Sequence, residues 1–315
     1  METLKDISLE KYNDAQYCYD YLNSHKTIGD EETEYNGIFH VHWRGPIDND
    51  KIILQIKSTL ATQEVDKIFF WIEDPLTTFM SPSYPKLNQF NKYVETKVFD
   101  KKILNQASGQ QKHKDKIWQY YTMNIHDKRY KTDIFRWIIL NIYGGLYTDL
   151  DTFLLRDVRD LKIKNWCSKW CEDPYIEACI LKLEKGSDVY EQMYLNNPNN
   201  PQCFNLYVGN YPEAWSFKHK NLNITSLPTN FFDMAWPATN IGSPVLSIEN
   251  FDKFFERTDK EITLDNFFKG CFSYHWHNRW DRPEYIDSPA GKLNAQLDEI
   301  IQEKYSIKPI KIFQK

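Results

Sequence analysis

The chain has 315 residues, of which 41% are hydrophobic and 26% charged, with a formal net charge of −5. This balance is typical of a globular protein and excludes a disordered chain, and the length fits one elaborated α/β domain or two ordinary domains. The acidic charge argues against general affinity for nucleic acid or anionic membranes, so an anionic substrate would need a local device such as a metal ion.

The sequence contains no apolar run of membrane-spanning length, since the longest, residues 135–143, is far too short. The first twenty residues also lack the basic-then-apolar order of a secretory signal peptide. We therefore expect a cytoplasmic protein without a transmembrane segment, and a Golgi or secretory location only if an anchor has been removed. Cys167, Cys171 and Cys179 have a spacing that suits zinc poorly, which predicts free thiols.

In chain order, residues 1–34 predict an acidic, helical lead-in. Residues 37–45 alternate as a strand does, residues 48–62 have helical spacing, and residues 66–74 read as a second strand. Strand, helix and strand in this order predict the start of a parallel α/β sheet. Residues 75–112 are mixed, with Pro82 and Pro85 marking loops.

The second half of the chain predicts a helix that ends at a Gly-Gly pair, followed by a strand. The expected elements are a helix over 126–145, a strand over 146–155, a helix pair or broken helix over 177–194, a loop over 197–205, an irregular stretch over 226–251 and a helix after 288. No internal repeat or low-complexity linker divides the chain, which favours one α/β domain.

The triplet Asp149-Leu150-Asp151 is the first candidate for a functional site. An Asp-x-Asp triplet alone is weak, and Asp48-Asn49-Asp50 is another in a polar turn. Asp149 and Asp151, however, follow Gly-Gly in a predicted apolar strand, where a period of two places both carboxylates on one face. Two such carboxylates repel unless a cation such as Mn²⁺ or Mg²⁺ joins them. The alternative is a solvent-exposed strand end.

Asp133 and Arg136 stand three residues apart on the preceding helix and share a face. They could form an ordinary surface ion pair, which contributes little. They could instead face the same crevice as the Asp-x-Asp triplet and bind sugar hydroxyls and phosphate.

Two further groups have functional and structural interpretations. His40, His42 and Trp43 lie on the first strand. They could be core aromatics with an edge histidine. Alternatively, Trp43 could stack on a base at the end of the strand. Residues 275–280, "HWHNRW", could be a surface loop. They could also complete a metal site through His275 or His277, with Trp280 reaching a phosphate.

Residues 130–155 resemble the signature of the family 32-type glycosyltransferases with the Asp-x-Asp sugar-binding region. This family is related to yeast Golgi mannosyltransferases, α-1,4-galactosyltransferases and, more distantly, glucosylating bacterial toxins. Its pattern runs Ser-Asp, two residues, Arg, an apolar helix, Gly-Gly and Tyr-x-Asp-x-Asp. Every position is filled here except the Ser, which is Thr132.

Flanking stretches resemble the same family in the right order. These are residues 39–46, 227–237, 239–247 and 274–280, so the resemblance covers about residues 36–285. Three positions depart from the family pattern: Ser243 is inserted between Gly and Pro, Tyr274 replaces a His and Arg279 replaces a Ser.

The resemblance implies an A-type glycosyltransferase fold, which is a Rossmann-like mixed sheet flanked by helices, over residues 35–290, between a lead-in over 1–34 and a helical tail over 291–315. It also implies a retaining transfer of a hexose from a nucleotide sugar, with UDP preferred to GDP, to a glycan or protein acceptor. The cofactor would be Mn²⁺ or Mg²⁺, and no nucleic acid partner is expected.

The same resemblance implies a role for each matching residue. Trp43 would stack on the donor base, Asp133 and Arg136 would hold the donor sugar, and Trp280 would contact the β-phosphate. Tyr147, Asp149 and Asp151 form the Tyr-x-Asp-x-Asp core, in which Asp149 lies near ribose and metal and Asp151 is a direct metal ligand. His275 best matches the late-chain histidine ligand, and His277 and Asn278 compete with it.

Two other classes remain as alternatives. A nucleotidyltransferase of the polymerase-β type also has glycines before an Asp-x-Asp strand, but there about ten residues intervene, whereas here only Leu146 to Thr148 do. A non-catalytic carbohydrate-binding protein derived from such an enzyme would be free to lose Asp133, Arg136, Asp149 and Asp151, all of which are intact.

Overall fold

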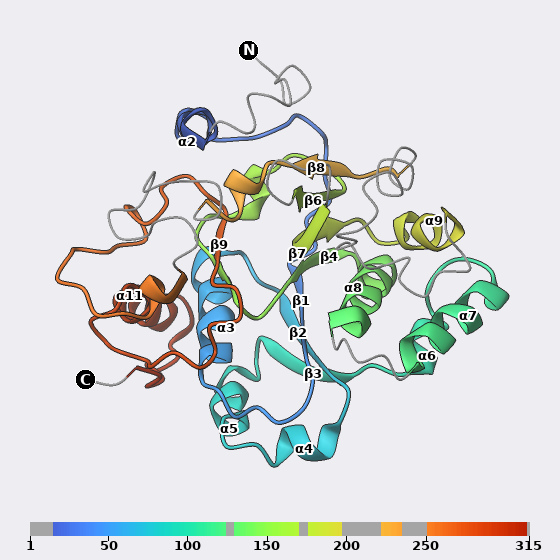
Figure 1. Cartoon of the computed structure of the whole chain (residues 1–315), viewed down its shortest axis with the longest axis horizontal. Helices are drawn as coiled ribbons and strands as arrows, with labels where there is room; N and C mark the ends of the chain where they lie inside the picture. The colour runs from blue at the N-terminus through green and yellow to red at the C-terminus, as the bar shows by residue number, and fades with distance from the viewer. Residues whose placement is uncertain (1–14, 124–128, 170–175, 197–221, 235–250, 314–315) are drawn as a thin grey trace.

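The computed structural model describes residues 15–123, 129–169, 176–196, 222–234 and 251–313. The loop expected over 197–205, residues 1–14 of the lead-in and much of the irregular stretch lie outside these ranges. Within them, the architecture is a central sheet with helices on both faces (Figure 1). The predicted α/β class, with a mixed sheet flanked by helices, is confirmed.

The main sheet has seven strands in the order β3-β2-β1-β4-β7-β6-β8. A parallel block comes first, made of β3 (Val94–Val98), β2 (Lys67–Ile72), β1 (Ile38–Trp43) and β4 (Gly145–Thr148). β7 (Ile176–Leu183) runs antiparallel to β4, β6 (Trp166–Lys169) runs antiparallel to β7, and β8 (Thr225–Leu227) pairs in parallel with β6. β1 and β2 were predicted from the sequence, whereas β3 was not.

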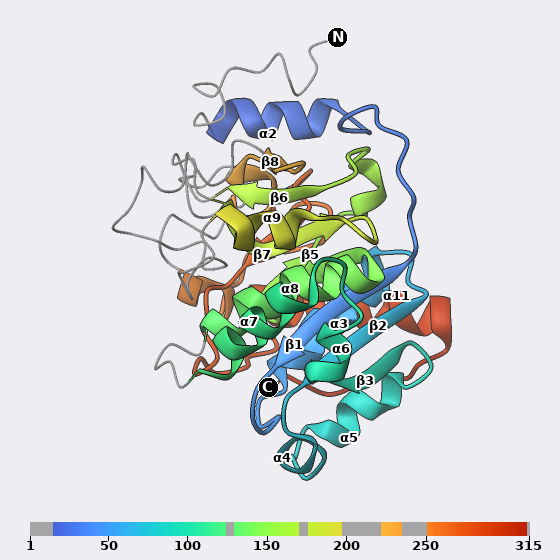
Figure 2. The same cartoon turned by 90° about the vertical axis from the view of Figure 1, so that its right-hand side faces the viewer.

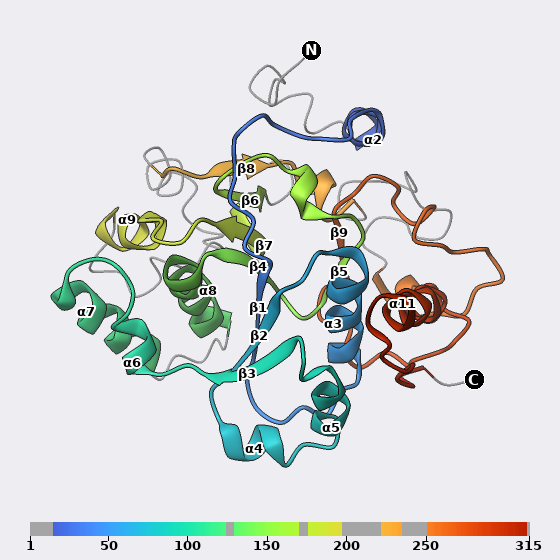
Figure 3. The ribbon, with the colours of Figure 1, turned by 180° about the vertical axis from the view of Figure 1, so that it is seen from behind.

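Helices cover both faces of the sheet, as expected when the chain first adds strands on one side of β1 and then on the other. α3 (Lys51–Thr62) and α11 (Pro289–Tyr305) pack on one face, while α8 (Arg129–Tyr143), α7 (Gln111–Thr122), α6 (Lys101–Leu104) and α9 (Val189–Asn196) lie on the other (Figures 1 and 3). The short α4 (Pro75–Phe79), α5 (Tyr84–Leu87) and η1 (Asn88–Phe90) lie near β3, and α2 (Ala15–Ser24) crosses the far end of the molecule (Figure 2). The predicted helices at α3, α8 and α11 are confirmed.

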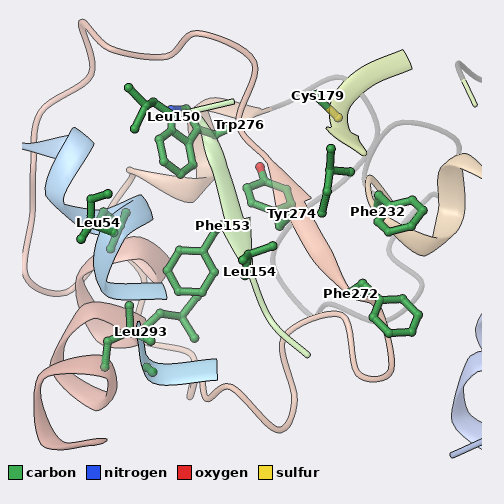
Figure 4. Packing of buried hydrophobic residues seen from close by; sticks show 14 of the residues in the cluster. Leu54, Leu150, Phe153, Leu154, Cys179, Phe232, Phe272, Tyr274, Trp276 and Leu293 are labelled. Atoms are coloured by element: carbon green, nitrogen blue, oxygen red, sulfur yellow. The ribbon is translucent and has the colours of Figure 1, made fainter. Parts of the chain in front are cut away.

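The strands bury both faces, so each contributes to two cores. On β2, Ile68, Phe70 and Ile72 pack with α3 and α11, while Trp71 packs with α8. The first core continues into a second, two-stranded sheet, where Phe153 and Tyr274 lie among α3 and α11 side chains such as Leu54 and Leu293 (Figure 4). Helix α11 is therefore packed into the main core.

The Gly144-Gly145 pair joins α8 to β4 through a turn that other residues would not accept. Both glycines have positive φ, 67° and 96°. A Cβ on Gly145 would lie 2.3 Å from the Ile38 carbonyl oxygen, and one on Gly144 would lie 2.7 Å from the Lys185 nitrogen. The pair thus lets α8 end tightly against the start of β4, as the predicted helix end requires.

Three sequence predictions were wrong in detail. Residues 176–183 form strand β7 instead of a helix, because a short apolar run buried on both faces cannot be told from a buried helix by periodicity. The strand expected over 146–155 breaks at Asp149, and β5 (Thr152–Leu154) then joins β9 (Ser273–His275) in the two-stranded sheet. Pro85, taken as a loop marker, lies within α5.

The four described cysteines, Cys18, Cys167, Cys179 and Cys271, are buried and form no disulfide, as predicted. No helix among the described residues is both long and apolar enough to cross a membrane.

Candidate active site

The Asp-x-Asp triplet lies at the point where the sheet reverses its winding. The chain moves outward from β1 through β2 to β3, then returns to place β4 on the other side of β1. Because β1 and β4 are parallel neighbours, the residues after both strands meet at one edge. Trp43 ends β1 and Asp149 follows β4 there, at the crevice where open α/β sheets bind ligands.

A turn between two sheets, and not strand alternation, brings the two carboxylates together. The Asp149 N–H donates to the Cys179 carbonyl at 2.7 Å, and the Thr152 N–H donates back to the Asp149 carbonyl at 3.1 Å. Leu150 between them is buried in the core (Figure 4). The prediction that the pair shares one face of a strand was therefore wrong, although its carboxylates do converge.

The register of β5 and β9 delivers a histidine to this turn. His275 pairs with Thr152, directly after Asp151. Its Nε2 lies 3.1 Å from Asp151 Oδ2, to which the Asn278 backbone N–H also donates at 2.8 Å. His277 and Asn278 have φ values of 48° and 58°, a left-handed backbone that is uncommon for residues other than glycine. The late-chain motif thus meets the central one through strand pairing.

The electrostatics of the turn follow from burial and close charges. Burial acts to raise the pKa of Asp151, but His275 and the Asn278 N–H outweigh it and lower that pKa to about 2. Burial likewise acts to lower the pKa of His275, and Asp151 raises it well above its ordinary value. Burial raises the pKa of Asp149, against the opposing charge of Arg136. Asp151 and His275 therefore form an ion pair beside a second carboxylate.

These three residues fit a divalent metal ion. Ligand atoms of Asp149, Asp151 and His275 all lie within 4.8 Å of one another. Two carboxylates and an imidazole are donors that Mn²⁺ accepts. The Asp149 side chain is 25% exposed and that of Asp151 only 7%, so a ligand can approach from the Asp149 side.

Arg136 links the helix to the triplet and is buried, so it is not part of a surface ion pair. Its guanidinium lies 3.0 Å from Asp133 Oδ1 and 3.6 Å from Asp149 Oδ1. It also donates to the backbone carbonyls of Thr132 and Ala178. Tyr147 lies under the guanidinium, 5.0 Å from ring centroid to Cζ, and donates its hydroxyl to Asp149 Oδ1 at 2.7 Å.

Trp43 and Trp280 are partly buried and form an aromatic corner next to the triplet. Their ring centroids lie 5.5 Å apart in an edge-to-face arrangement. The Trp280 indole N–H donates to Asn278 Oδ1 at 3.2 Å. Trp43 and Trp280 are thereby connected through Asn278 to Asp151.

Lys51 and Asn49, at the start of α3, hold this corner in place. The buried Lys51 Nζ donates to the carbonyls of Trp280 and Arg282 at 2.7 and 2.6 Å. The Asn49 amide donates to the same Trp280 carbonyl at 2.7 Å. Neither residue was predicted from the sequence, because nothing in their spacing indicates a contact more than 200 positions away.

The histidines of β1 are structural. His40 is buried, its Nε2 lies 3.0 Å from the Gly144 carbonyl, and its Nδ1 accepts from the Trp71 indole at 3.1 Å. His42 is also buried, with Nδ1 3.2 Å from the Thr132 hydroxyl. Burial lowers the pKa of each to about 3, so both are neutral. His40 connects β1 to the residue after α8, and His42 connects it to the first turns of that helix.

Asp233 is a buried carboxylate that the sequence analysis did not single out. It follows η3 (Thr229–Phe231), and its Oδ2 lies 2.5 Å from His277 Nε2. The signal was present, since an acid after two phenylalanines must find a partner once buried. His277 therefore faces Asp233, while His275 faces Asp151.

Comparison with known proteins gives the class. Residues 49–170 match the family described as "Glycosyltransferase sugar-binding region containing DXD motif". This stretch contains Asp133, Arg136, Asp149 and Asp151 and confirms the resemblance found in the sequence. The chain carries a glycosyltransferase region, and the protein is a transferase enzyme that acts on a sugar donor and an acceptor.

The following solved structures with a similar fold are glycosyltransferases that share little sequence identity with this chain. PaToxG glycosyltransferase has 14% identity and a TM-score of 0.43 over 66% of this chain and 76% of its own. Mouse xyloside xylosyltransferase 1 has 12% identity and a TM-score of 0.40 over 78% and 99%. An active-site mutant of LgtC has 10% identity and a TM-score of 0.42 over 84% and 95%. No curated protein matches the sequence.

Proposed function

We propose that the protein is a retaining, metal-dependent glycosyltransferase that moves a hexose from a nucleotide sugar, preferably a UDP-sugar, to a glycan or protein acceptor. One observation carries this proposal: Asp149, Asp151 and His275 converge beside the buried Arg136 at the switch point of the sheet. A nucleotide diphosphate needs this combination of a cation site and a fixed guanidinium in an acidic protein.

The donor diphosphate would lie against the Asp149–Asp151 turn. A Mn²⁺ or Mg²⁺ ion held by Asp149, Asp151 and His275 would neutralise the diphosphate as it leaves the anomeric carbon. The Trp280 indole N–H, which already aims at Asn278, can donate to a phosphate oxygen instead. His275 rather than His277 is the third ligand, because its Nε2 lies 3.1 Å from Asp151 whereas His277 is engaged by Asp233.

The sugar and the base would occupy the two sides of this turn. Asp133 and Arg136 form a preoriented pair whose oxygens and N–H groups can hold sugar hydroxyls. Trp43, at the end of β1, offers an aromatic surface for the base. Tyr147 keeps Asp149 oriented through the hydrogen bond from its hydroxyl.

The proposal is tested by screening UDP- and GDP-sugars for hydrolysis with and without Mn²⁺. We expect one sugar nucleotide to be hydrolysed slowly, only with the ion, and the released sugar to keep its anomeric configuration by NMR. Asp133→Asn should abolish this activity, and Asp115→Asn, an exposed acid on α7, is the matched control. Absence of hydrolysis with every donor, or hydrolysis that Asp133→Asn leaves intact, would refute the proposal.

A further inference from the structure

A second group of metal-binding side chains lies directly behind the first. Asp233, His275 and His277 offer one carboxylate oxygen and two ring nitrogens, all within 4.8 Å of one another. We propose that these residues form a second divalent-metal site, selective for a borderline ion such as Zn²⁺, which competes with the Asp149–Asp151 site for His275. The competition part of this proposal rests on the proposed function.

The geometry brings three separate segments to one point. Asp233 Oδ2 lies 2.5 Å from His277 Nε2 and 4.0 Å from His275 Nδ1. The two imidazole rings stack with centroids 4.0 Å apart, and Phe251 lies against His277, also at 4.0 Å. Ligand atoms around a zinc ion lie about 2.0–2.2 Å from it, so small side-chain rotations would bring this group to ligand distances.

Burial makes the carboxylate costly unless a cation joins it. Asp233 is 1% exposed, and its Oδ1 has no hydrogen-bond partner within the described part of the chain. A buried carboxylate oxygen without a partner destabilises the fold. A metal ion between Asp233 and the two histidines would offset that cost.

The donor sets of the two sites favour different ions. The front set, Asp149, Asp151 and His275, has two carboxylates and one imidazole, which suits hard ions such as Mn²⁺ and Mg²⁺. The rear set has one carboxylate and two imidazoles, a typical zinc set with three protein ligands. The same histidine belongs to both.

His275 can serve one ion at a time. A neutral imidazole has one N–H and one lone pair, so the tautomer decides which carboxylate group it joins. When Nε2 binds an ion beside Asp151, the Nδ1–H faces Asp233; when Nδ1 binds an ion beside Asp233, the Nε2–H can donate to Asp151. Each carboxylate is then the outer-sphere partner of the other site. Zinc at the rear site should therefore weaken Mn²⁺ binding at the front.

The test measures Zn²⁺ binding by calorimetry, without nucleotide, in variants that separate the two sets. Asp233→Asn and His277→Asn change ligands of the rear site only, and Asn tolerates the left-handed backbone at position 277. The double variant Asp149→Asn/Asp151→Asn changes ligands of the front site only. We expect the rear variants to lose at least about 100-fold in Zn²⁺ affinity and the front variant, in which the rear site loses an outer-sphere partner but no ligand, to lose about tenfold or less.

A second measurement follows Mn²⁺ by electron paramagnetic resonance while Zn²⁺ is added. Zinc should release Mn²⁺ at concentrations that saturate the rear site in the wild type, and should lose this effect at those concentrations in Asp233→Asn. His113→Ala removes another histidine–carboxylate pair, in which His113 Nδ1 lies 2.9 Å from Glu191 Oε1, and should change neither result.

Zinc affinity that is unchanged in both rear variants, or lost only in the front variant, would overturn the second site. Circular dichroism of each variant shows whether it is folded, and either rear variant alone can decide. If Mn²⁺ does not bind the wild type, the proposed function fails, but the Zn²⁺ titrations still test the rear site independently.

Discussion

The chain contains two Asp-x-Asp triplets whose surroundings differ in every respect. In Asp48-Asn49-Asp50, Asp48 is exposed. Asp50 occupies the N-cap position of α3, but its side chain pairs with Lys86 and accepts from the Ser83 hydroxyl at 2.7 Å instead of capping the helix. In Asp149-Leu150-Asp151, both acids lie at the end of a buried strand among Arg136, His275 and Tyr147.

The difference shows that the triplet itself carries little information. What distinguishes the second triplet is the pair of connections around it: Gly144-Gly145 fixes the start of β4, and the pairing of β5 with β9 brings His275 from more than 120 positions away. The acids of the first triplet have ordinary surface partners, which contribute little to stability, although Asn49 between them donates to the Trp280 carbonyl. The first prediction changes one triplet and uses the other as its control, and the later ones change residues that contact or directly follow a triplet.

The largest effect is expected for Asp151→Asn. The amide keeps the shape but cannot neutralise a divalent ion, so donor hydrolysis should fall by at least about 100-fold. Asp48→Asn should change the rate by less than about twofold, since Asp48 is exposed. Initial rates of sugar release at saturating Mn²⁺ measure both. Equal effects of the two substitutions would erase the distinction between the triplets.

The next effect concerns the cation beside each triplet. Arg136→Lys should lower kcat by about 10–100-fold, because an ammonium cannot contact Asp133, Asp149 and the Ala178 carbonyl together. Lys86→Met, at the other triplet, should leave kcat unchanged and cost less than about 1 kcal/mol of unfolding free energy. Steady-state kinetics measure kcat, and urea unfolding measures the unfolding free energy. Wild-type turnover in Arg136→Lys would contradict the role of the pair.

Lys51 directly follows the first triplet, and its substitution tests whether this part of the chain supports the candidate site indirectly. Lys51→Met removes the donor to the Trp280 and Arg282 carbonyls and should destabilise the fold by about 1–3 kcal/mol. Because Trp280 would lose its anchor, UDP affinity should fall by several-fold while kcat changes less. Tryptophan fluorescence titration measures the affinity, and Lys86→Met is the control. Unchanged UDP affinity would show that the anchor does not matter for binding.

The smallest effect is a pH dependence at the same residue. Burial lowers the pKa of Lys51 to about 8, although Glu284 and Asp281 act to raise it. Arg282 lowers it further. Between pH 8 and the ordinary lysine pKa of about 10.4, the unfolded chain holds more protons than the folded one, so stability rises with pH. The unfolding free energy of the wild type should therefore rise relative to Lys51→Met from pH 8 to pH 10. A difference in unfolding free energy between the wild type and Lys51→Met that does not change with pH would refute this prediction.

The sequence was sufficient for the elements whose signals are local. The strands at β1 and β2, the helices α3, α8 and α11, and the Gly-Gly junction follow from periodicity and turn chemistry. β7 was mistaken for a helix because a strand buried on both faces has no period of two. The turn at Asp149 was missed because it depends on β5 pairing with β9, a contact that the local pattern does not encode.

For the candidate site, the sequence indicated candidate residues but not their arrangement. Asp149, Asp151 and Arg136 were identified from charge within an apolar segment, and His275 was left in competition with His277. The register of β9 distinguishes these two histidines, since it sets His275 against Asp151 and leaves His277 to Asp233. Lys51 and Asp233 could not be assigned, because their partners are distant in sequence.

The central claim is that the second triplet, with His275, holds a divalent ion together with the donor diphosphate. Electron paramagnetic resonance of Mn²⁺, titrated with and without UDP, tests it most directly. We predict one bound ion whose affinity rises with UDP in the wild type and in Asp50→Asn, and no such ion in Asp151→Asn. Mn²⁺ binding that Asp151→Asn leaves unchanged, or that UDP does not strengthen in the wild type, would contradict the account.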